Sequence, residues 1–407
     1  MQTISQKFIK AVLNPRLLFN RLSDAVLLIV IGFPSALLVR ICRPIVHCRF
    51  APIYCAKLGN IWIGAELYLC EKELGIHKQY QDFLFTKGVI VNQALLTTIK
   101  HRIEFYPIAK YIHWANSFFP DEKDFTVDIY DADYTGLRQL TGKQFENSNS
   151  VRKRGEEWLK SMGIEPNQPL LLFSNRDARH LERLMPERDW SYHNYRNSSI
   201  NNLLPMVEHF VEQGYAAIRM GADVAEPLQS NNPMIIDYPN VGRTDERDVF
   251  LGERCNLSIS SPSGVRGFAE MFRRPSGIIN ACPITTELLL GDKKLLQAPG
   301  LWIPKQYWLI AEKRFMSLRE IIDLGANQFF HTQDYSSAGI KLIENSPEEI
   351  LELGLEMKQH INNESSLTDE DIKLYQKFWQ IVLPNMNIKG RSKIGISFLK
   401  RNRYLLD

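Results

Sequence analysis

Short apolar runs alternate with amphipathic stretches of ten to fifteen residues through the second half of the chain. At 199–215 the residues Leu203, Val207 and Phe210 recur at helical spacing, which predicts one buried helix face. Strands that alternate with helices of this length indicate βαβ units and a parallel sheet. We therefore expect an α/β fold, with strands inside 169–175, 216–221, 234–239, 257–262 and 276–281 and a short helix at 264–272.

The end of the chain predicts two further helices and a basic segment. Residues 345–363 form a strong amphipathic pattern, in which Ser346 is the expected N-cap and Glu348 lies near the positive end of the helix. Residues 369–383 predict a second helix, and lysine and arginine are frequent after it. We expect residues 366–407 to form a C-terminal helix and a basic tail.

The first half of the chain is expected to form a separate α/β domain. Residues 51–75 give an apolar strand, a glycine turn, an amphipathic helix and a terminating glycine, and 87–101 give another strand and helix. A further helix is expected at 151–163, and a proline-rich lead into the next apolar run places a domain boundary near Pro166. The expected domains are 46–164 and 165–365.

The first 45 residues differ in composition from the rest. Lysines and arginines stand among apolar residues at first, and an uncharged run then extends over 25–39. This run is shorter than the ~20 residues of a spanning helix, it contains Pro34, and no clean cleavage site follows it. We expect residues 1–45 to be a monotopic anchor that places a cytoplasmic protein peripherally on the inner membrane. The alternative is a hydrophobic helix packed on the protein's own core.

Length and composition describe a globular protein with more than one domain. The 407 residues exceed one small core, and 44% hydrophobic with 23% charged residues is ordinary for a folded chain. The net charge of +3 is nearly neutral for this length and gives no indication of nucleic-acid binding. None of the six cysteines forms a CxxC pair, so we expect reduced thiols rather than disulfides or a zinc site.

Three expected strand ends carry residues suited to an anion. Ligands of open parallel sheets bind beyond the carboxyl ends of the strands, where this chain has FSNRDARH at 173–180, AIRMGAD at 217–223 and SSPSG at 260–264. Arginine offers planar, permanently charged donors, and a helix N-terminus with hydroxyl groups offers N–H and O–H donors for phosphate. The alternative is a set of capped turns and surface ion pairs. The residues expected to bind a diphosphate are Arg176, Arg219, Gly221, Ser261, Ser263 and Gly264.

A loop rich in aromatic and polar residues precedes the helix at 199–215. Its members could hold a sugar or base by stacking and hydrogen bonds, and they are Tyr192, His193, Tyr195, Arg196 and Asn197. The alternative is a capping loop, with Asn197 or Ser198 as the N-cap. The DADY stretch at 131–134 is similar to a DxD metal motif, but carboxylates at this spacing are common on surfaces, and we expect no metal site.

Several of these stretches together resemble a known family. The segments YHNYRNSSI at 192–200, AAIRMG at 216–221, SPSGVRGFAEMFRRP at 261–275 and ENSPEEI at 344–350 resemble a family of bacterial glycosyltransferases from surface-polysaccharide gene clusters. The resemblance covers most of the chain from about Ala51. It implies a GT-B-like fold, in which two Rossmann-like domains face each other across a cleft and the C-terminal domain holds the nucleotide-sugar donor. It further implies that Arg176 and the turn from Ser261 to Gly264 face the donor diphosphate, with Glu270 and Asn280 flanking it.

The expected activity is glycosyl transfer without a resident cofactor, with the nucleotide sugar as co-substrate. Oriented N–H groups and arginines would stabilise the charge that develops on the departing nucleoside diphosphate. An inverting reaction also needs a base for the acceptor hydroxyl, for which the candidates are Asp177, His180 and Glu66, with His101 and Glu104 beside them. The expected acceptor is a lipid-linked or polysaccharide glycan at the membrane surface. Two alternatives stay open, a GT-B-like sugar-nucleotide epimerase or polymer-modifying transferase and a non-catalytic nucleotide-sugar-binding or scaffold protein.

Overall fold

The chain forms two compact units. The structure is a computed structural model that describes residues 22–133, 136–184, 186–289, 300–382 and 393–407. The first unit comprises residues 1–91 and 99–131, and the second comprises 92–98 and 132–407.

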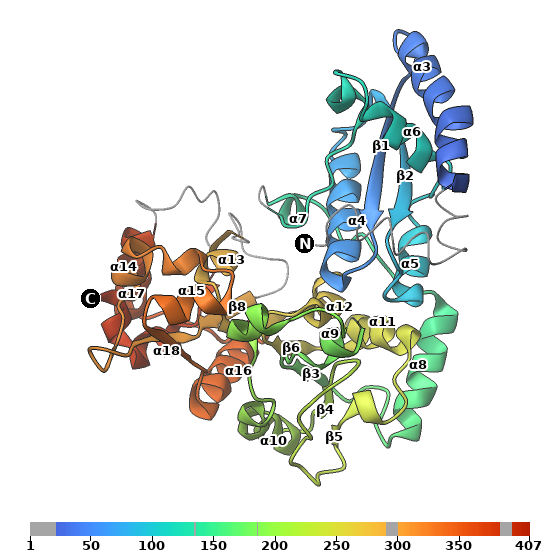
Figure 1. Cartoon of the computed structure of the whole chain (residues 1–407). Coiled ribbons are helices and arrows are strands. Elements are labelled where there is room, and N and C mark those ends of the chain that lie inside the picture. The colour runs from blue at the N-terminus through green and yellow to red at the C-terminus, as the bar shows by residue number, and fades with distance from the viewer. Residues whose placement is uncertain (1–21, 134–135, 185, 290–299, 383–392) are drawn as a thin grey trace. The chain divides into compact units, whose positions relative to one another are not determined.

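The second unit is built on a seven-stranded parallel sheet (Figure 1). Its strands are β3 (Leu170–Ser174), β4 (Ala216–Arg219), β5 (Ile235–Ile236), β6 (Leu257–Ser260), β7 (Ser276–Ala281), β8 (Gly300–Pro304) and β12 (Lys393–Ile394). The spatial order is β12-β8-β7-β6-β3-β4-β5, and every pair of neighbours is parallel. The chain therefore moves outward from β3 to β5 and then returns to the other side of β3 as β6. This reversal makes the β3–β6 pair the topological switch point of a doubly wound sheet.

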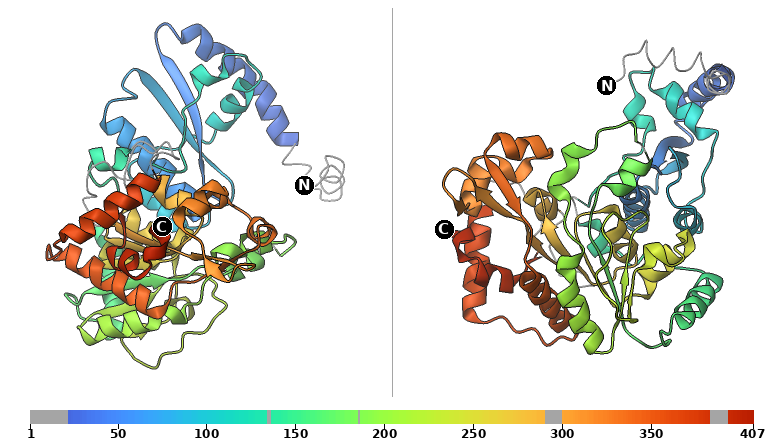
Figure 2. Two further views of the ribbon diagram at one scale, coloured as in Figure 1. Left: turned by 90° about the vertical axis from the view of Figure 1, so that its left-hand side faces the viewer. Right: turned by 60° about the horizontal axis from the view of Figure 1, so that its bottom comes forward.

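Helices cover both faces of this sheet (Figures 1 and 2). On one face α10 (Leu204–Glu212) packs against α16 (Pro347–Ile361), and on the other α11 (Asp245–Arg254) packs against α8 (Asn149–Ser161) and α12 (Gly267–Glu270). The helix α16 begins with the expected cap, because the Ser346 hydroxyl accepts the N–H of Glu349 and the Glu349 carboxylate accepts the N–H of Ser346. The remaining α-helices of the unit are α7 (Leu137–Leu140), α9 (Arg179–Leu184), α13 (Ile284–Leu289), α14 (Leu318–Asp323), α15 (Thr332–Ser337), α17 (Asp369–Val382), α18 (Ile396–Arg401) and most of α5 (Gln93–Lys100).

The expected α/β class with a parallel sheet is confirmed, and all five expected strands of the second half are present. The sequence pattern did not predict β8 and β12, nor a small antiparallel sheet of β9 (Gln306–Leu309), β10 (Arg314–Phe315) and β11 (Ile340–Ile343). The expected basic tail is wrong for residues 393–407. Its apolar side chains Ile394, Phe398 and Leu406 are buried in the main core of the unit, and β12 extends the large sheet.

The first unit contains a two-stranded parallel sheet within its described residues. β1 (His47–Tyr54) pairs with β2 (Tyr80–Lys87), and the helices around it are α3 (Phe33–Cys42), α4 (Leu58–Glu73) and α6 (Ala109–Asn116). The strand expected within 87–101 is misplaced, because β2 ends at Lys87, where Gly88 turns the chain with a φ of 91°. The apolar residues after this glycine are in a loop, and Val89 is exposed.

The boundary between the units differs from the one that the proline pattern predicts. The first unit ends at Asp131 rather than near Pro166, and α8 belongs to the second unit. The close approach of α8 to α11 explains this, since a Cβ atom on Gly155 would lie 2.3 Å from the ring of Phe250. Only glycine at this position lets the aromatic ring pack against the helix backbone.

We predict that Gly155→Ala destabilises the protein by about 1 to 3 kcal/mol, because the added methyl group forces the Phe250 ring out of its place. The measurement is urea unfolding followed by tryptophan fluorescence. Gly59→Ala is the matched control, because Gly59 also lies in a helix and its Cβ would meet nothing within 4 Å. Equal midpoints for both variants would contradict the packing argument.

Candidate functional site

The site expected from the strand ends lies at the switch point of the large sheet. Ser174 at the end of β3 pairs with Ser260 at the end of β6, and the N–H of Ser261 donates to the carbonyl oxygen of Ser174 at 3.1 Å. The chain therefore leaves both strands at the same edge, one side as Asn175-Arg176 and the other as the turn from Ser261 to Gly264. In doubly wound sheets this edge is where ligands bind.

Arg176 forms hydrogen bonds with the loop at 192–198, which lies about twenty residues later in the sequence. Its guanidinium donates to the carbonyl oxygen of His193 at 3.2 Å and to Oδ1 of Asn197. The backbone of the same loop is held as well, since the N–H of Ser198 donates to the Arg176 carbonyl at 3.1 Å and Asn175 donates to the Ser198 carbonyl at 2.5 Å. The structure thus joins Arg176 to the loop at 192–198, which the sequence offered as a separate candidate.

Two more cations meet the same loop. The guanidinium of Arg196 donates to the carbonyl oxygen of Pro262 in the turn after β6, at 2.7 Å. The ammonium of Lys305, which follows β8, donates to the carbonyl oxygen of Asn197 at 2.5 Å. Asn197 thus contacts Lys305 through its backbone and Arg176 through its side chain.

Arg176 and Lys305 are buried and Arg196 is partly buried, and none of the three forms an ion pair with a described carboxylate. Arg176 is 7% exposed and Lys305 is 4% exposed, and in the described part of the chain no Asp or Glu forms an ion pair with Arg176, Arg196 or Lys305. Their hydrogen bonds go to neutral carbonyl and amide oxygens. Transferring a single charged side chain from water into a protein interior without a counter-ion costs on the order of several kcal/mol.

The acid–base behaviour of the three cations follows from this burial. Loss of water lowers the pKa of Arg176 to about 10, and the charge of Arg196 lowers it further. Burial likewise lowers the pKa of Arg196, although the charge of Glu287 opposes this shift. Burial also lowers the pKa of Lys305 and outweighs the opposing charge of Glu344. The positive charge of each group is therefore disfavoured by its surroundings, and an anion placed among them would relieve all three.

Arg266, only a few residues from the turn, shows the opposite arrangement. It forms ion pairs with Glu270 at 3.3 Å and with Glu287 at 3.0 Å. Although burial opposes it, these two carboxylates raise the pKa of Arg266. Glu270, expected from the family resemblance to flank the donor, therefore serves as a partner of Arg266 in this structure.

The turn after β6 presents hydroxyl groups that are not used within the protein. Ser261 is fully buried, and among the described residues neither its Oγ nor that of Ser263 has a hydrogen-bond partner. The Ser263 residue precedes the helical turn at 264–266 with extended backbone, but its side chain does not cap that turn. Both hydroxyl groups are thus available as donors beside the three cations.

Three other expected binding or flanking residues also make contacts within the protein, although Nε and Nη2 of Arg219 and Nδ2 of Asn280 have no hydrogen-bond partner among the described residues. Arg219 at the end of β4 is fully buried and forms an ion pair with Asp237 at 3.2 Å, so it has its own counter-ion. Asn280 exchanges hydrogen bonds with Asn345, its N–H donating at 2.6 Å and its Oδ1 accepting at 2.7 Å. At Gly221 an added Cβ would lie 3.0 Å from Val224, so this glycine serves a close approach within its own loop.

The aromatic residues of the loop form a stack rather than an isolated pair. The rings of Tyr192 and His193 have centroids 3.9 Å apart, and Tyr192 also faces His331 at 5.6 Å. Tyr195 is buried against Tyr335, with the ring centroids 5.6 Å apart. Tyr195 is therefore part of the core, whereas Tyr192 presents a partly exposed ring.

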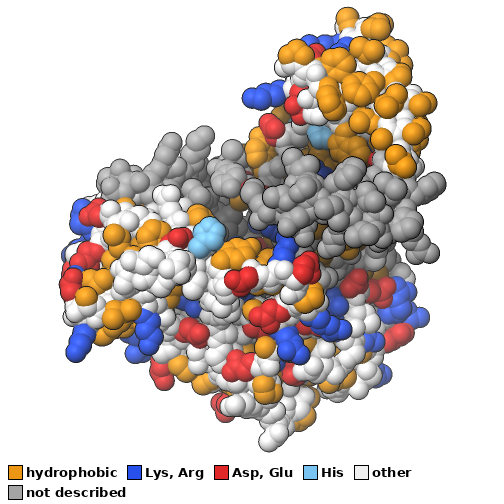
Figure 3. Space-filling view, viewed as in Figure 1, with side chains coloured by type: hydrophobic (Ala, Val, Ile, Leu, Met, Phe, Trp, Pro, Cys, Tyr) orange, Lys and Arg blue, Asp and Glu red, His pale blue; other side chains and the backbone are white. Residues whose placement is uncertain are grey.

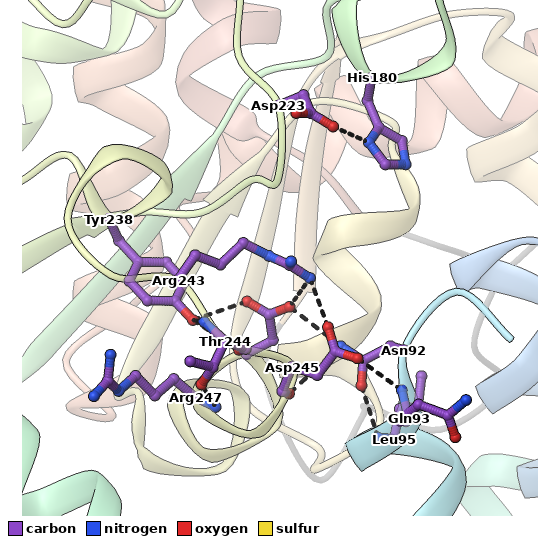
Figure 4. A network of polar contacts seen from close by, with 11 residues as sticks. Asn92, Gln93, Leu95, His180, Asp223, Tyr238, Arg243, Thr244, Asp245 and Arg247 are labelled. Carbon is purple, nitrogen blue, oxygen red and sulfur yellow. Dashed lines mark hydrogen bonds and ion pairs between the residues drawn. The ribbon is translucent and has the colours of Figure 1, made fainter. Parts of the chain in front are cut away.

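The candidate bases have different surroundings. Asp177 accepts the N–H groups of Arg179 and Ala225, both at 3.0 Å, which fixes the turn after β3. His180 forms an exposed pair with Asp223 at 2.9 Å, as Figure 4 shows. Although burial opposes it, hydrogen bonds from His180 and Arg183 lower the pKa of Asp223. A carboxylate that holds one ring nitrogen of a histidine leaves the other free to accept a proton.

The candidates of the first unit differ in exposure. Glu66 is fully buried in α4, whereas His101 and Glu104 are exposed and Glu104 accepts the hydroxyl of Tyr106. In the DADY stretch Asp133 accepts the backbone N–H groups of Leu137 and Arg138, which is the contact of a turn. No group of three or more His, Cys, Asp or Glu side chains with metal-binding geometry occurs in the part of the chain that the structure describes.

Lys305 is the residue of this site that the sequence pattern did not predict. It directly follows the apolar run LWIP at 301–304, which the structure shows to be β8. A lysine directly after an apolar run is the sequence feature that could have indicated a cation at a strand end. The run follows a stretch without helical or strand periodicity, so it was not assigned to the sheet.

Comparison with known proteins finds similarity at the level of solved structures. No protein-family model and no curated protein matches the chain. The crystal structure of a glycosyl transferase family 9 protein from Veillonella parvula is similar over 79% of this chain and 99% of that one, with 12% identity and a TM-score of 0.44. The structure of the Escherichia coli ADP-heptose LPS heptosyltransferase II is similar over 78% and 100%, with 10% identity and a TM-score of 0.42.

A second polar cluster of the same unit has a structural role (Figure 4). Asp248 on α11 is buried and accepts from Arg243 at 2.5 Å, from the hydroxyl of Tyr238 at 3.1 Å and from Asn92 at 3.2 Å. Asn92 in turn caps α5, and Asp245 accepts the N–H of the next residue of that helix at 2.8 Å. The cluster therefore fastens the start of α5 to α11. Burial raises the pKa of Asp248 to about 7 and outweighs the charge of Arg243.

We predict that this carboxyl makes stability depend on pH. Because its pKa is raised in the folded state, its contribution is present below its ordinary pKa of 3.8 and is lost as pH rises through about 7. Urea unfolding between pH 4 and 8 should therefore show a falling free energy of unfolding, by at most about 1.4 kcal/mol per pH unit. Asp248→Asn should reduce this slope, and Asp245→Asn, its neighbour in the same cluster, should keep it. Parallel curves for the wild type and Asp248→Asn would contradict the assignment.

Proposed function

We propose that the protein is a glycosyltransferase of GT-B type that transfers a sugar from a nucleotide-sugar donor to an acceptor hydroxyl. The observation that supports this most is the group of three cations, the buried Arg176 and Lys305 and the partly buried Arg196, which form no ion pair among the described residues. They surround the carboxyl ends of the central strands, where doubly wound sheets bind nucleotides. The donor diphosphate would supply the missing negative charge.

The number of charges favours a diphosphate over a carboxylate. A nucleotide sugar carries one negative charge on each phosphate, and the released nucleoside diphosphate gains a further one. Three cations therefore match the product side of the reaction better than the intact donor. Groups that bind the developing charge more strongly than the ground state lower the barrier to transfer. The hydroxyl groups of Ser261 and Ser263 would add neutral donors to the same phosphates.

The reaction breaks one bond and forms one bond at the anomeric carbon. The acceptor oxygen forms the new bond, the bond to the β-phosphate oxygen breaks, and its electron pair leaves with the nucleoside diphosphate. The three cations stabilise the negative charge of this leaving group, a task that a bound metal ion performs in other transferases. The acceptor proton goes to a base, for which His180 with Asp223, Asp177 and Glu66 are the proposed candidates.

The proposed acceptor is a lipid-linked or polysaccharide glycan of bacterial surface-glycan synthesis. The apolar helix at Leu22–Cys42 supports an acceptor presented at the inner membrane, since a transferase held at that surface meets lipid-linked substrates there. The proposed location is the cytoplasm, with peripheral association with the inner membrane.

Replacing Lys305 by methionine tests the site without depending on an acceptor. The substitution removes a buried charge that lacks a counter-ion, so we expect thermal stability to stay equal or to rise. Binding of the donor should weaken about 10- to 100-fold, because a hydrogen bond to a charged group is lost. The measurement is a thermal-shift and calorimetric titration with UDP, GDP, CMP and dTDP sugars.

Arg314→Gln is the control for this experiment. Arg314 is an exposed arginine of the same unit that pairs with Glu320, and its removal should leave donor binding unchanged. Turnover of the bound donor with a glycan acceptor, unaffected by EDTA, is the expected result for a metal-independent transferase. Saturable binding without turnover would identify a binding protein instead. A stable wild-type protein that binds none of these nucleotides would remove the proposal.

A further inference from the structure

The helix at the start of the described chain is apolar enough to enter a bilayer, but it is fastened to the first unit along one side. It extends from Leu22 to Cys42 with a mean hydropathy of 2.4, and only 11% of its most apolar window is buried within the protein. Both properties are typical of a membrane helix. The polar contacts at its two ends distinguish a helix that crosses the bilayer from one that lies in its surface.

Two polar contacts hold the ends of this helix. Near its start Asp24 accepts from the ammonium of Lys110 at 3.1 Å and from the hydroxyl of Tyr111 at 2.8 Å, both on α6. Near its end Arg40 donates to Asp121 at 2.7 Å and to the side chain of Asn116 at 2.6 Å. Asp24 and Arg40 lie about 24 Å apart along a helix that rises about 1.5 Å per residue. The helix is thus fixed over nearly its whole length.

Small residues bring the middle of the helix close to α6. Gly32 and Ala36 are buried, and they share a face with Asp24 and Arg40 because the four recur at intervals of four or eight residues. A Cβ atom on Gly32 would lie 2.7 Å from the carbonyl oxygen of Tyr111. The contact face is therefore closely packed between the two polar contacts.

The opposite face is apolar and exposed. Figure 3 shows hydrophobic side chains gathered over α3 and the part of the first unit around it. These exposed residues recur at helical spacing and continue into the turn after the helix. They are Leu22, Val26, Ile29, Val30, Leu37, Leu38, Ile41, Ile45 and Val46, with Phe118 beside them.

We propose that this face lies in one leaflet of a bilayer, with the helix parallel to the membrane plane and not crossing it. A crossing helix would carry Asp24, Arg40 and their partners on α6 into the hydrocarbon, which is about 30 Å thick. Buried ion pairs in lipid are costly, whereas a helix lying in the interface keeps these groups on the protein side.

The composition of the face favours lipid over a protein partner. Its large exposed hydrophobic side chains on the helix are all aliphatic, and they include no Tyr or Trp, the aromatic anchors that carry much of the binding energy of protein interfaces. The sequence before the helix adds charge complementarity with anionic lipid, because residues 1–21 contain Lys7, Lys10, Arg16 and Arg21 and no Asp or Glu. The membrane contact does not depend on the donor site, so either proposal can fail while the other holds.

The first experiment is flotation of the full-length protein with phosphatidylcholine vesicles that contain phosphatidylglycerol. We expect the wild type to float and the double variant Val30→Glu/Leu37→Glu to lose at least tenfold in bound fraction. The matched control is Ile310→Glu/Ile372→Glu, which places the same charges on exposed isoleucines of the second unit and should float like the wild type. All four substituted residues are exposed, and unchanged circular-dichroism melting verifies that each variant is folded.

The second experiment distinguishes the in-plane helix from a crossing one. Inside-out inner-membrane vesicles from cells that express the protein with an N-terminal and a C-terminal epitope tag are treated with protease. Both tags should be digested, because both ends lie on the cytoplasmic side. A protected N-terminal tag overturns the in-plane arrangement. A wild-type protein that does not float, or that floats equally well with the two glutamates, overturns the membrane contact, and a dimer that dissociates in the double variant would assign the face to a second copy instead.

Discussion

The central constraint on this protein is the withdrawal of three positive charges from water at the switch point of its sheet, where none of them forms an ion pair with a described carboxylate. Arg176, Arg196 and Lys305 donate only to neutral oxygens, and one residue, Asn197, joins two of them. A chain that folded for stability alone would gain by replacing these cations with apolar side chains of similar size. Their position therefore needs a ligand to explain it. A bound anion would offset the desolvation cost of these cations, and this gain would contribute to the affinity for the anion.

The strand order makes this arrangement possible with few residues. β3 and β6 are neighbours in space although the chain travels through β4 and β5 between them, so their carboxyl ends deliver Arg176 and the turn at 261–264 to one point. β8 lies two strands beyond β6 in the sheet order. The loop at 191–198 contacts both ends of this distance, because its Asn197 carbonyl accepts from Lys305 and its Arg196 donates to the carbonyl of Pro262. The loop itself contributes one of the three cations, Arg196. It holds the three cations at fixed positions, and this pre-organisation is what electrostatic stabilisation of a leaving group requires.

The sequence could predict most of the second unit, because its strands are continuous apolar runs and its helices have a clear amphipathic period. It could also place Arg176 and Ser261 at the ends of neighbouring strands, since both closely follow an apolar run, whereas their role in binding stays a prediction. It could not separate Arg176 from Arg219, because both are arginines at strand ends and only the fold shows that Asp237 neutralises one of them. The role of Glu270 and the position of Lys305 depend on contacts across the sheet, and no local pattern encodes those. The domain boundary was missed for a similar reason, since a single glycine packed against Phe250 assigns α8 to the second unit.

The buried charged groups of this chain differ in whether the protein itself supplies their partners. Asp248 is buried like Arg176, but its partners Arg243, Tyr238 and Asn92 come from the protein itself, and the result is a fastening of α5. Arg176 and its neighbours form no ion pair with a described carboxylate, and we propose that a ligand completes them. In the N-terminal helix the polar side is satisfied by α6, whereas the aliphatic side is exposed among the described residues. Both proposals therefore start from an interaction that the described residues leave incomplete, and each proposed partner, a diphosphate in one unit and a lipid surface in the other, has the chemistry that would complete it.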